Sequence, residues 1–238
     1  MREIIVIQCQ GRKTQESWRC GNQQVIFVAD KKKYDEKSNR ASGLVPYEPD
    51  DFVSNSSTMT WRQIFLEYYQ TKRKPAVLQD ANELPEAWQL YRHSAYRCLV
   101  ENKKYGKENV FILSAGWGLV NADYWLPPYN ITFSTAENTP DYARTSVKKL
   151  WQRLEPLKYN PLCKIANKDT TIYFFGGKDY IPLYYHLTCN LPCRKVVYYK
   201  SAKIPRHKGY EYVPYAGDIV TNWHYQCLKD FMEGKLRK

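Results

Sequence analysis

The chain has 238 residues, 43% of them hydrophobic, which suits one globular domain and excludes a low-complexity chain. Its 36 Lys and Arg residues outnumber its 24 Asp and Glu residues, and the formal net charge is +12. A charge of this size favours polyanions, and the 21 Tyr and 7 Trp residues supply rings that stack on bases or line polar pockets. Nucleic acid is therefore the expected partner, and a merely basic soluble protein is the alternative.

The seven cysteines, an odd number, come without a secretory signal or an apolar run long enough to span a bilayer. This pattern indicates a cytoplasmic protein with reduced thiols and no membrane partner, and no obligate protein partner is evident. Cys189 and Cys193 lie four residues apart, with Cys163 upstream and His186 nearby, and such side chains can bind zinc. Pro192 and the lack of a second clean cysteine pair weaken that pattern, and we expect neither a metal nor another cofactor.

The first predicted element is a buried strand over residues 2–7, where a continuous apolar run is typical of a parallel sheet. Gln8, Gln10, Gly11, Arg12 and Lys13 follow it directly. Amides, a glycine and two cations after a buried strand are well placed for contacts with base edges or phosphates. The spacing of glycine and lysine does not match a P-loop, and an ordinary basic turn is the alternative.

The next predicted elements are a second strand or edge piece, a long surface loop and two helices. The strand covers residues 25–29, and the polar residues 30–51 form the loop, so we expect an insertion at about 30–60. Apolar residues recur at helical spacing over 61–70, with Thr60 as a plausible cap. Pro85 begins a second helix that continues to Leu99.

The central stretch, residues 109–129, opens with a buried strand over 110–113. Gly116 and Gly118 allow a tight turn, and Trp117 lies between them at the carboxyl end of the strand, where open α/β sheets bind ligands. Polar and aromatic side chains follow, and they include Asn121, Asp123, Tyr124, Trp125 and Tyr129. We interpret this stretch as the pocket wall for a planar ligand such as a nucleobase. A strand-to-loop corner whose aromatic rings belong to the core is the alternative.

A second strand-to-helix junction comes later in the chain. A strong strand over residues 170–175 is followed by Gly176, Gly177, Lys178, Asp179 and Tyr180, and then by a helix over 181–187. Backbone N–H groups at such a junction can bind an anion, and Lys178 adds positive charge. Asp179 either caps the helix or takes part in catalysis, and Tyr180 either stacks on a ligand or packs in the core.

The remaining predicted elements are a helix, a strand, a basic loop, a second loop and a final helix, over 139–154, 195–199, 201–208, 212–218 and 218–232. Arg206 in the basic loop is expected to contact a nucleic-acid backbone. His224 lies on the final helix, where a lone histidine is more often a packed or surface residue than a ligand.

Three segments, Ile112–Val120, Pro128–Tyr129 and Phe175–Tyr180, resemble a large bacterial family of proteins related to the peroxide stress protein. The resemblance covers the first strand and about residues 85–190. That family's core is similar to the uracil-DNA-glycosylase-like fold. The resemblance therefore implies one α/β domain over 1–238, a three-layer sandwich with a mostly parallel central sheet that handles a nucleobase. Trp117, Asn130 and the Gln10–Arg12 segment depart from the family's pattern, which implies an altered substrate.

Some members of this group act in phage defence as DNA glycosylases that remove modified bases. The resemblance thus implies a glycosylase that extrudes a base from double-stranded phage DNA and leaves an abasic site. Its substrate class would be cytosine carrying a hydroxymethyl group or a sugar. The alternatives are a non-catalytic DNA- or RNA-binding module that recognises modified or damaged bases, and, more distantly, an enzyme acting on small nucleotides.

The glycosylase hypothesis gives each candidate residue a role. Asp123 or Asp179 would supply the carboxylate that activates or positions a water molecule. The base-binding candidates are Gln8, Gln10, Trp117, Asn121, Tyr129 and Tyr180. The phosphate-binding candidates are Arg12, Lys13, Gly176, Gly177, Lys178 and Arg206.

Overall fold

The structure is a computed structural model, and it describes residues 1–36, 43–54, 57–201 and 203–236. Its main sheet has six strands in the order β10-β9-β8-β1-β5-β6. In chain order these are β1 (Arg2–Gln8), β5 (Val110–Ser114), β6 (Gly118–Asn121), β8 (Thr170–Phe175), β9 (Arg194–Tyr199) and β10 (Glu211–Pro214). All neighbouring strands run parallel except β5 and β6, which form an antiparallel pair. The predicted α/β fold with a mostly parallel sheet is confirmed.

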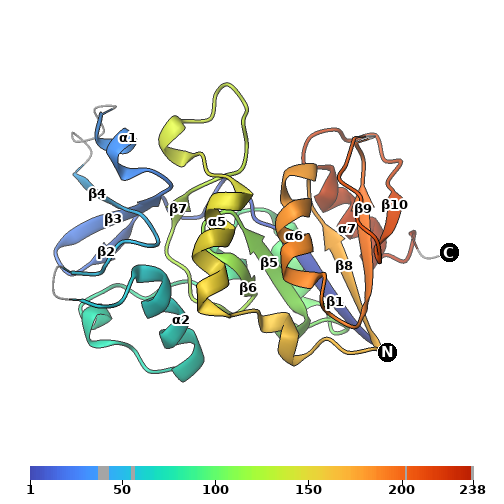
Figure 1. The fold of residues 1–238 in the computed structure, drawn as a ribbon, viewed down its shortest axis with the longest axis horizontal. Helices are drawn as coiled ribbons and strands as arrows, with labels where there is room; N and C mark the ends of the chain where they lie inside the picture. The colour runs from blue at the N-terminus through green and yellow to red at the C-terminus, as the bar shows by residue number, and fades with distance from the viewer. Residues whose placement is uncertain (37–42, 55–56, 202, 237–238) are drawn as a thin grey trace.

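Strand β1 lies near the middle of the main sheet because its side chains are apolar on both faces. Ile4, Ile5, Val6 and Ile7 are all fully buried. The longer helices are α2 (Trp61–Thr71), α4 (Ser94–Glu101), α5 (Val147–Leu154), α6 (Ile181–Thr188) and α7 (Trp223–Met232). Figure 1 shows α5 and α6 on the near face of the main sheet and α7 on the far face, so the central strands are covered on both sides. No helix in the described ranges is long and apolar enough to cross a membrane.

A smaller sheet lies beside the β5–β6 end of the main sheet (Figure 1). It contains β2 (Trp18–Cys20), β3 (Gln23–Val28), β4 (Leu44–Tyr47) and β7 (Tyr129–Asn130). Aromatic rings from this sheet, α2 and the β5–β6 turn pack edge to face: Trp18, Phe27, Trp61, Phe65 and Trp117. The two sheets therefore share one hydrophobic core.

Five predicted elements need correction. The final helix, predicted over 218–232, begins only at Trp223. The loop predicted over residues 30–51 contains α1 (Lys31–Glu36) and β4, although residues 37–42 of that prediction lie outside the described ranges. Strand β4 forms because its backbone pairs with β3, a contact that local sequence does not reveal. The predicted second loop, 212–218, likewise contains most of β10, which pairs with β9.

The single helix predicted from Pro85 is two helices, α3 (Ala87–Leu90) and α4. Tyr91 between them is extended, and the backbone here is tied to the first-strand turn. Leu90 O accepts a hydrogen bond from Thr14 N, and His93 N donates one to Gln10 Oε1. These tertiary bonds outweigh the continuous helical pattern.

The helix predicted over 139–154 begins only at Val147. Ser146 caps it by accepting a hydrogen bond from Lys149 N. Before it, Asp141–Ala143 form only a 3₁₀ turn, and Thr145 N donates to Thr132 O.

Candidate functional site

The parallel pairing of β1, β5 and β8 brings three predicted turns to one edge of the main sheet. Gln8 lies beside Leu113, and Ile7 lies beside Phe175, so the strands end at nearly the same level. We call this the carboxyl edge, and the opposite one the amino edge. The carboxyl edge is where ligands bind in open α/β sheets.

Buried hydroxyl groups form a chain at the carboxyl edge. Ser114 Oγ donates to Tyr129 OH at 2.8 Å, and Tyr129 OH and Tyr91 OH share a hydrogen bond of 2.8 Å. Ser114 Oγ in turn accepts from the backbone N–H groups of Gly116 and Trp117. Both tyrosines are only 3% exposed. The predicted turn after β5 is thus rigidly joined to residues that are distant in the sequence.

More tyrosine hydroxyls extend this network to β1 and α7. Tyr180 OH lies 3.2 Å from Cys9 Sγ. Tyr96 OH donates to Gln8 O at 2.7 Å and hydrogen-bonds Tyr225 OH at 3.0 Å. Burial raises the pKa of Tyr91, Tyr129, Tyr96 and Tyr180 well above its ordinary value. These hydroxyls are therefore neutral hydrogen-bonding groups at physiological pH.

The two glutamines after β1 have fixed amide orientations. Gly177 N donates to Gln8 Oε1 at 2.5 Å, and His93 N donates to Gln10 Oε1 at 2.9 Å. Because a backbone N–H must meet an oxygen, each side-chain NH₂ group points elsewhere. Neither NH₂ group has a hydrogen-bond partner within the described ranges. Both are donors available to a ligand.

Lys13 is a buried cation at the same edge. It is 8% exposed, and Nζ lies 3.9 Å from the ring centroid of Tyr129 and 5.8 Å from that of Tyr91. Nζ donates to Gly11 O at 3.2 Å, and no carboxylate pairs with it in the described part of the chain. Burial lowers the pKa of Lys13 to about 8, while the nearby Cys9 acts in the opposite direction.

The Gly176–Gly177 turn is close to β1 but does not form the predicted anion cradle. Gly177 N is already bonded to Gln8, and a Cβ at Gly176 would lie 2.5 Å from the Phe174 ring. Glycine is therefore needed there for close packing. Lys178 and Asp179 follow in a short 3₁₀ turn, and both side chains are exposed at the carboxyl edge.

The side chains of three other predicted residues do not join these groups. Arg12 is exposed in the first-strand turn. Arg206 donates to Tyr199 OH at 3.0 Å, at the carboxyl end of β9, two strands away from β1. Trp117 is 5% exposed and packs in the aromatic core, 5.3 Å from the Phe27 ring. Its ring is therefore not open to a base in this structure.

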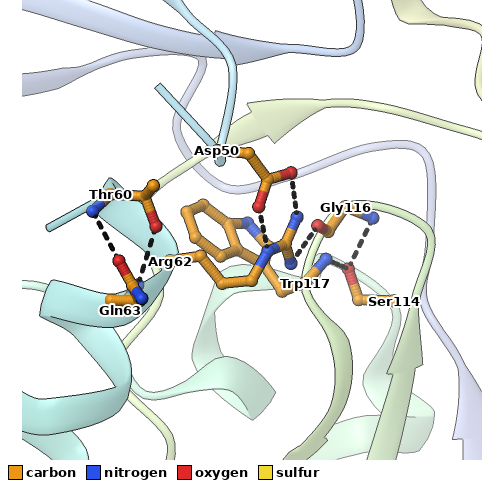
Figure 2. Close-up of polar contacts among 7 residues, drawn as sticks. All are labelled: Asp50, Thr60, Arg62, Gln63, Ser114, Gly116 and Trp117. Atoms are coloured by element: carbon orange, nitrogen blue, oxygen red, sulfur yellow. Dashed lines mark hydrogen bonds and ion pairs between the residues drawn. The ribbon is translucent and has the colours of Figure 1, made fainter. Parts of the chain in front are cut away.

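Figure 2 shows what holds the turn after β5 in place. Arg62 is buried and forms a two-pronged ion pair with Asp50, at 2.7 and 2.9 Å. It also donates to Gly116 O at 2.8 Å, and its guanidinium lies 5.6 Å from the Trp117 ring. Arg62 belongs to α2, which begins with a capping box between Thr60 and Gln63. Through these bonds Arg62 joins α2 and the segment after β4 to the turn after β5 at the carboxyl edge.

Asn121 and Asp123 lie at the amino edge, away from the other candidates. The reason is that β6 runs back antiparallel to β5, so that Asn121 lies beside Phe111. Asp123 accepts a hydrogen bond from Tyr69 OH at 2.8 Å, and burial together with this bond raises the pKa of Tyr69. The structure therefore does not bring Asp123 together with Gln8, Lys13 or Asp179.

Asp123 lines a separate pocket at the amino edge. Five cationic residues also line it: Arg2, Lys72, Lys107, Lys158 and Lys164. Lys72 Nζ lies 3.9 Å from the Tyr69 ring centroid. Lys72 and Lys158 have left-handed backbones with φ of 56° and 50°, which non-glycine residues adopt at a cost.

Sequence reasoning did not single out Ser114, Tyr91, Tyr96 or Tyr225 as site residues. The signal that could have pointed to them is the high tyrosine count, since buried tyrosines require hydrogen-bond partners.

Among the described residues, no three His, Cys, Asp or Glu side chains gather as a metal site would require.

The model of a family of unknown function, DUF6884, matches residues 76–198. The matched range contains β5, β6, β8 and the carboxyl-edge residues from Tyr91 to Tyr180, but not the turn after β1. No curated protein matches the sequence.

Proposed function

The chain belongs to the DUF6884 family, whose function is unknown, and we propose that it is a DNA glycosylase whose site is the carboxyl edge. It would excise a modified nucleobase and leave an abasic site. The supporting fold assignment, a three-layer domain of the uracil-DNA-glycosylase type, rests on the resemblance of Ile112–Val120, Pro128–Tyr129 and Phe175–Tyr180.

The observation that carries the proposal is the pair of unpartnered amide donors on Gln8 and Gln10. Their orientation is fixed by backbone N–H groups from two distant segments. A flipped base is read by hydrogen bonds to its edge, and two oriented NH₂ groups match carbonyl or ring-nitrogen acceptors. The neutral tyrosine hydroxyls around them add further polar contacts without charge.

Asp179 is the candidate acid that lies on this edge, since Asp123 lies on the other. Its carboxylate would orient a water molecule toward C1′ of the flipped nucleotide. As the N-glycosidic bond breaks, the bonding electrons go to the base, the water oxygen bonds to C1′, and the water proton is released. The exposed cations Arg12, Lys178 and Arg206 would contact the phosphates of a double-stranded DNA.

The substrate class we propose is cytosine carrying a hydroxymethyl group or a sugar, as in the DNA of phages, and the setting is antiviral defence in the cytoplasm. A hydroxymethyl group carries one hydroxyl, and a sugar carries several. The donors of Gln8 and Gln10 and the charge of Lys13 suit such a group.

One observation favours the alternative, a non-catalytic module that recognises modified or damaged bases in DNA or RNA. Asp179 is exposed, whereas the buried groups at the edge are neutral hydroxyls and one lysine, with the half-buried amides of Gln8 and Gln10 beside them. Such groups suffice for recognition without hydrolysis.

The experiment that separates these functions uses plain, uracil-containing, hydroxymethylated and glucosylated DNA. The purified protein is incubated with each DNA, with and without chelator, and alkali then converts abasic sites into strand breaks. Breaks confined to one modified DNA establish the glycosylase and identify its substrate. Binding without breaks on any of them establishes the recognition module instead.

A further inference from the structure

We propose that Lys13 is an amine nucleophile that forms an imine with the C1′ aldehyde of an abasic site, giving the protein a strand-cleaving lyase activity. This inference rests on the proposed function, because an abasic site is the product of that function. Lys13, which the sequence analysis gave a phosphate-binding role, would instead carry out this reaction.

The position of Lys13 places its amine among the other candidate groups. Lys13 follows the carboxyl end of β1 by five residues, and its backbone forms a β-bridge with Tyr91. The side chain then lies over the face of Tyr129, whose hydroxyl is bonded to Ser114. The amine thus lies between Gly11 in the turn after β1 and Tyr129, which is bonded to Ser114 at the end of β5.

The surroundings of Lys13 differ from those of lysines with a structural role. Lys31 and Lys107 pair with the carboxylates of Asp51 and Glu86. Lys13 instead has two aromatic rings and one backbone carbonyl, and no carboxylate within the described ranges. Removing a lysine from water without a counter-ion disfavours the charged form.

Burial also gives the amine the protonation state that a nucleophile requires. The pKa of Lys13 is lowered to about 8, so a substantial share of the amine is neutral near that pH. Lysines desolvated in apolar pockets form Schiff bases with carbonyl substrates for this reason. Tyr91 and Tyr129 stay protonated over the same pH range, because burial raises the pKa of both.

Lys195 is an internal comparison for Lys13. It is 7% exposed, and its Nζ donates to Leu191 O at 2.7 Å. It lies at the start of β9, beside Ile172, and so belongs to the amino side of the sheet. Lys195 is therefore as buried as Lys13 but has no access to the carboxyl edge.

The reaction needs no redox partner. The neutral Lys13 nitrogen adds to the aldehyde carbon C1′ of the open-chain sugar, and uptake of one proton from solvent with loss of water gives a protonated imine. The imine acidifies the C2′ hydrogen, a solvent water accepts that proton, and the 3′ phosphate leaves with the electrons of the C3′–O bond. Water then hydrolyses the imine, which restores the lysine and releases the unsaturated aldehyde on the other strand fragment.

The test offers abasic DNA directly, so that base excision is not required. Wild-type protein, Lys13→Arg and Lys195→Arg are each incubated with an abasic duplex and sodium borohydride, which reduces an imine to a stable amine. We expect a covalent protein–DNA adduct with the wild type and with Lys195→Arg, and its loss with Lys13→Arg. Peptide mass spectrometry of the wild-type adduct should place the DNA on Lys13. This measurement does not depend on how well the variant folds.

The outcomes separate this inference from the proposed function, because release of free base from modified DNA is measured on the same samples. Base release without any wild-type adduct, or an adduct mapped to another amine, overturns the role of Lys13 and leaves the glycosylase intact. An adduct on Lys13 without base release from any DNA supports the amine chemistry and overturns the glycosylase.

Discussion

The two edges of the main sheet carry similar residue types but organise them differently. At the carboxyl edge, Gln8, Gln10 and Lys13 are held by bonds to segments far away in the sequence. At the amino edge, five cationic residues and Asp123 surround an open pocket. Both edges combine basic and aromatic side chains, the composition that suggests nucleic acid. Composition alone therefore does not locate the site.

The direction of each strand determines which candidate residues lie at the same edge of the main sheet. Asp123 is nine positions after Ser114, yet the hairpin between β5 and β6 carries it to the opposite edge. Asp179 is far from Gln8 in the sequence, yet the parallel pairing of β1 and β8 brings its turn to the same edge. Four changes would break or sharpen this comparison.

The largest expected effect separates the two acids. Asp179→Asn removes the carboxylate at the carboxyl edge and should slow base excision by about 10²–10⁴-fold while DNA binding is retained. Asp123→Asn should leave the excision rate within about 2-fold, because its side chain lies at the amino edge. The rate of abasic-site formation under single-turnover conditions measures both. The opposite ranking would move the site to the amino-edge pocket.

The second effect concerns stability and pH. His224 on α7 is buried beside Tyr225, and burial together with His93 lowers its pKa to about 3. In the unfolded chain its pKa is about 6.5, so below that pH the unfolded state binds more protons than the folded state. Stability should therefore fall by about 2 kcal/mol between pH 7 and pH 5, and the loss should end only below about pH 3.

Urea unfolding at several pH values measures how the free energy of unfolding changes with pH. In the variant His224→Phe, most of the predicted fall between pH 7 and pH 5 should disappear. The same fall in that variant would mean that the folded protein does not hold His224 neutral.

The third change compares a tyrosine hydroxyl at each edge. Tyr129→Phe leaves Ser114 and Tyr91 without their shared partner and should lower the free energy of unfolding by about 1–3 kcal/mol. Tyr159, which lines the amino-edge pocket, has no hydroxyl hydrogen bond in the described ranges, and Tyr159→Phe should cost less than about 0.5 kcal/mol. Denaturant unfolding measures both free energies. Equal losses in the two variants would show that the hydrogen-bonded hydroxyls at the carboxyl edge do not contribute specially to stability.

The smallest effect has the opposite sign. Lys158 ends a helical turn with φ of 50°, and glycine adopts this backbone without steric cost. Lys158→Gly should therefore stabilise the protein by roughly 1 kcal/mol and leave base excision unchanged. Thermal unfolding measures the gain, and a loss of excision would indicate that the strained lysine serves the reaction.

Local sequence patterns predicted the parts of the fold that depend on local chemistry. Continuous apolar runs predicted β1, β5, β8 and β9, and Thr60 predicted the start of α2. The strands β2, β4, β6, β7 and β10 were not predicted, because short strands form only when a partner strand is present.

The candidate site was predictable to a similar extent. The turns after β1 and β8 follow strong strands that the sequence predicts, and the parallel pairing of these strands brings Gln8 and Asp179 to one edge. Trp117 and Asp123 both come after β5 in the sequence, but packing against the smaller sheet buries Trp117 and the β6 hairpin carries Asp123 to the other edge. Those outcomes depend on tertiary contacts that one sequence does not display.

The most direct test of the carboxyl-edge site exchanges one amide at each edge. Gln8→Glu keeps the oxygen that accepts from Gly177 N, but it replaces the NH₂ donor with a carboxylate oxygen and adds a negative charge, whereas Gln70→Glu makes the same change beside the amino-edge pocket. The quantity to measure is the rate of free modified base released from DNA, by mass spectrometry. Loss of one base-reading hydrogen bond should slow release by Gln8→Glu about 10-fold or more, with Gln70→Glu unaffected. Unchanged release by Gln8→Glu, or slower release only by Gln70→Glu, would contradict a base-binding site at the carboxyl edge.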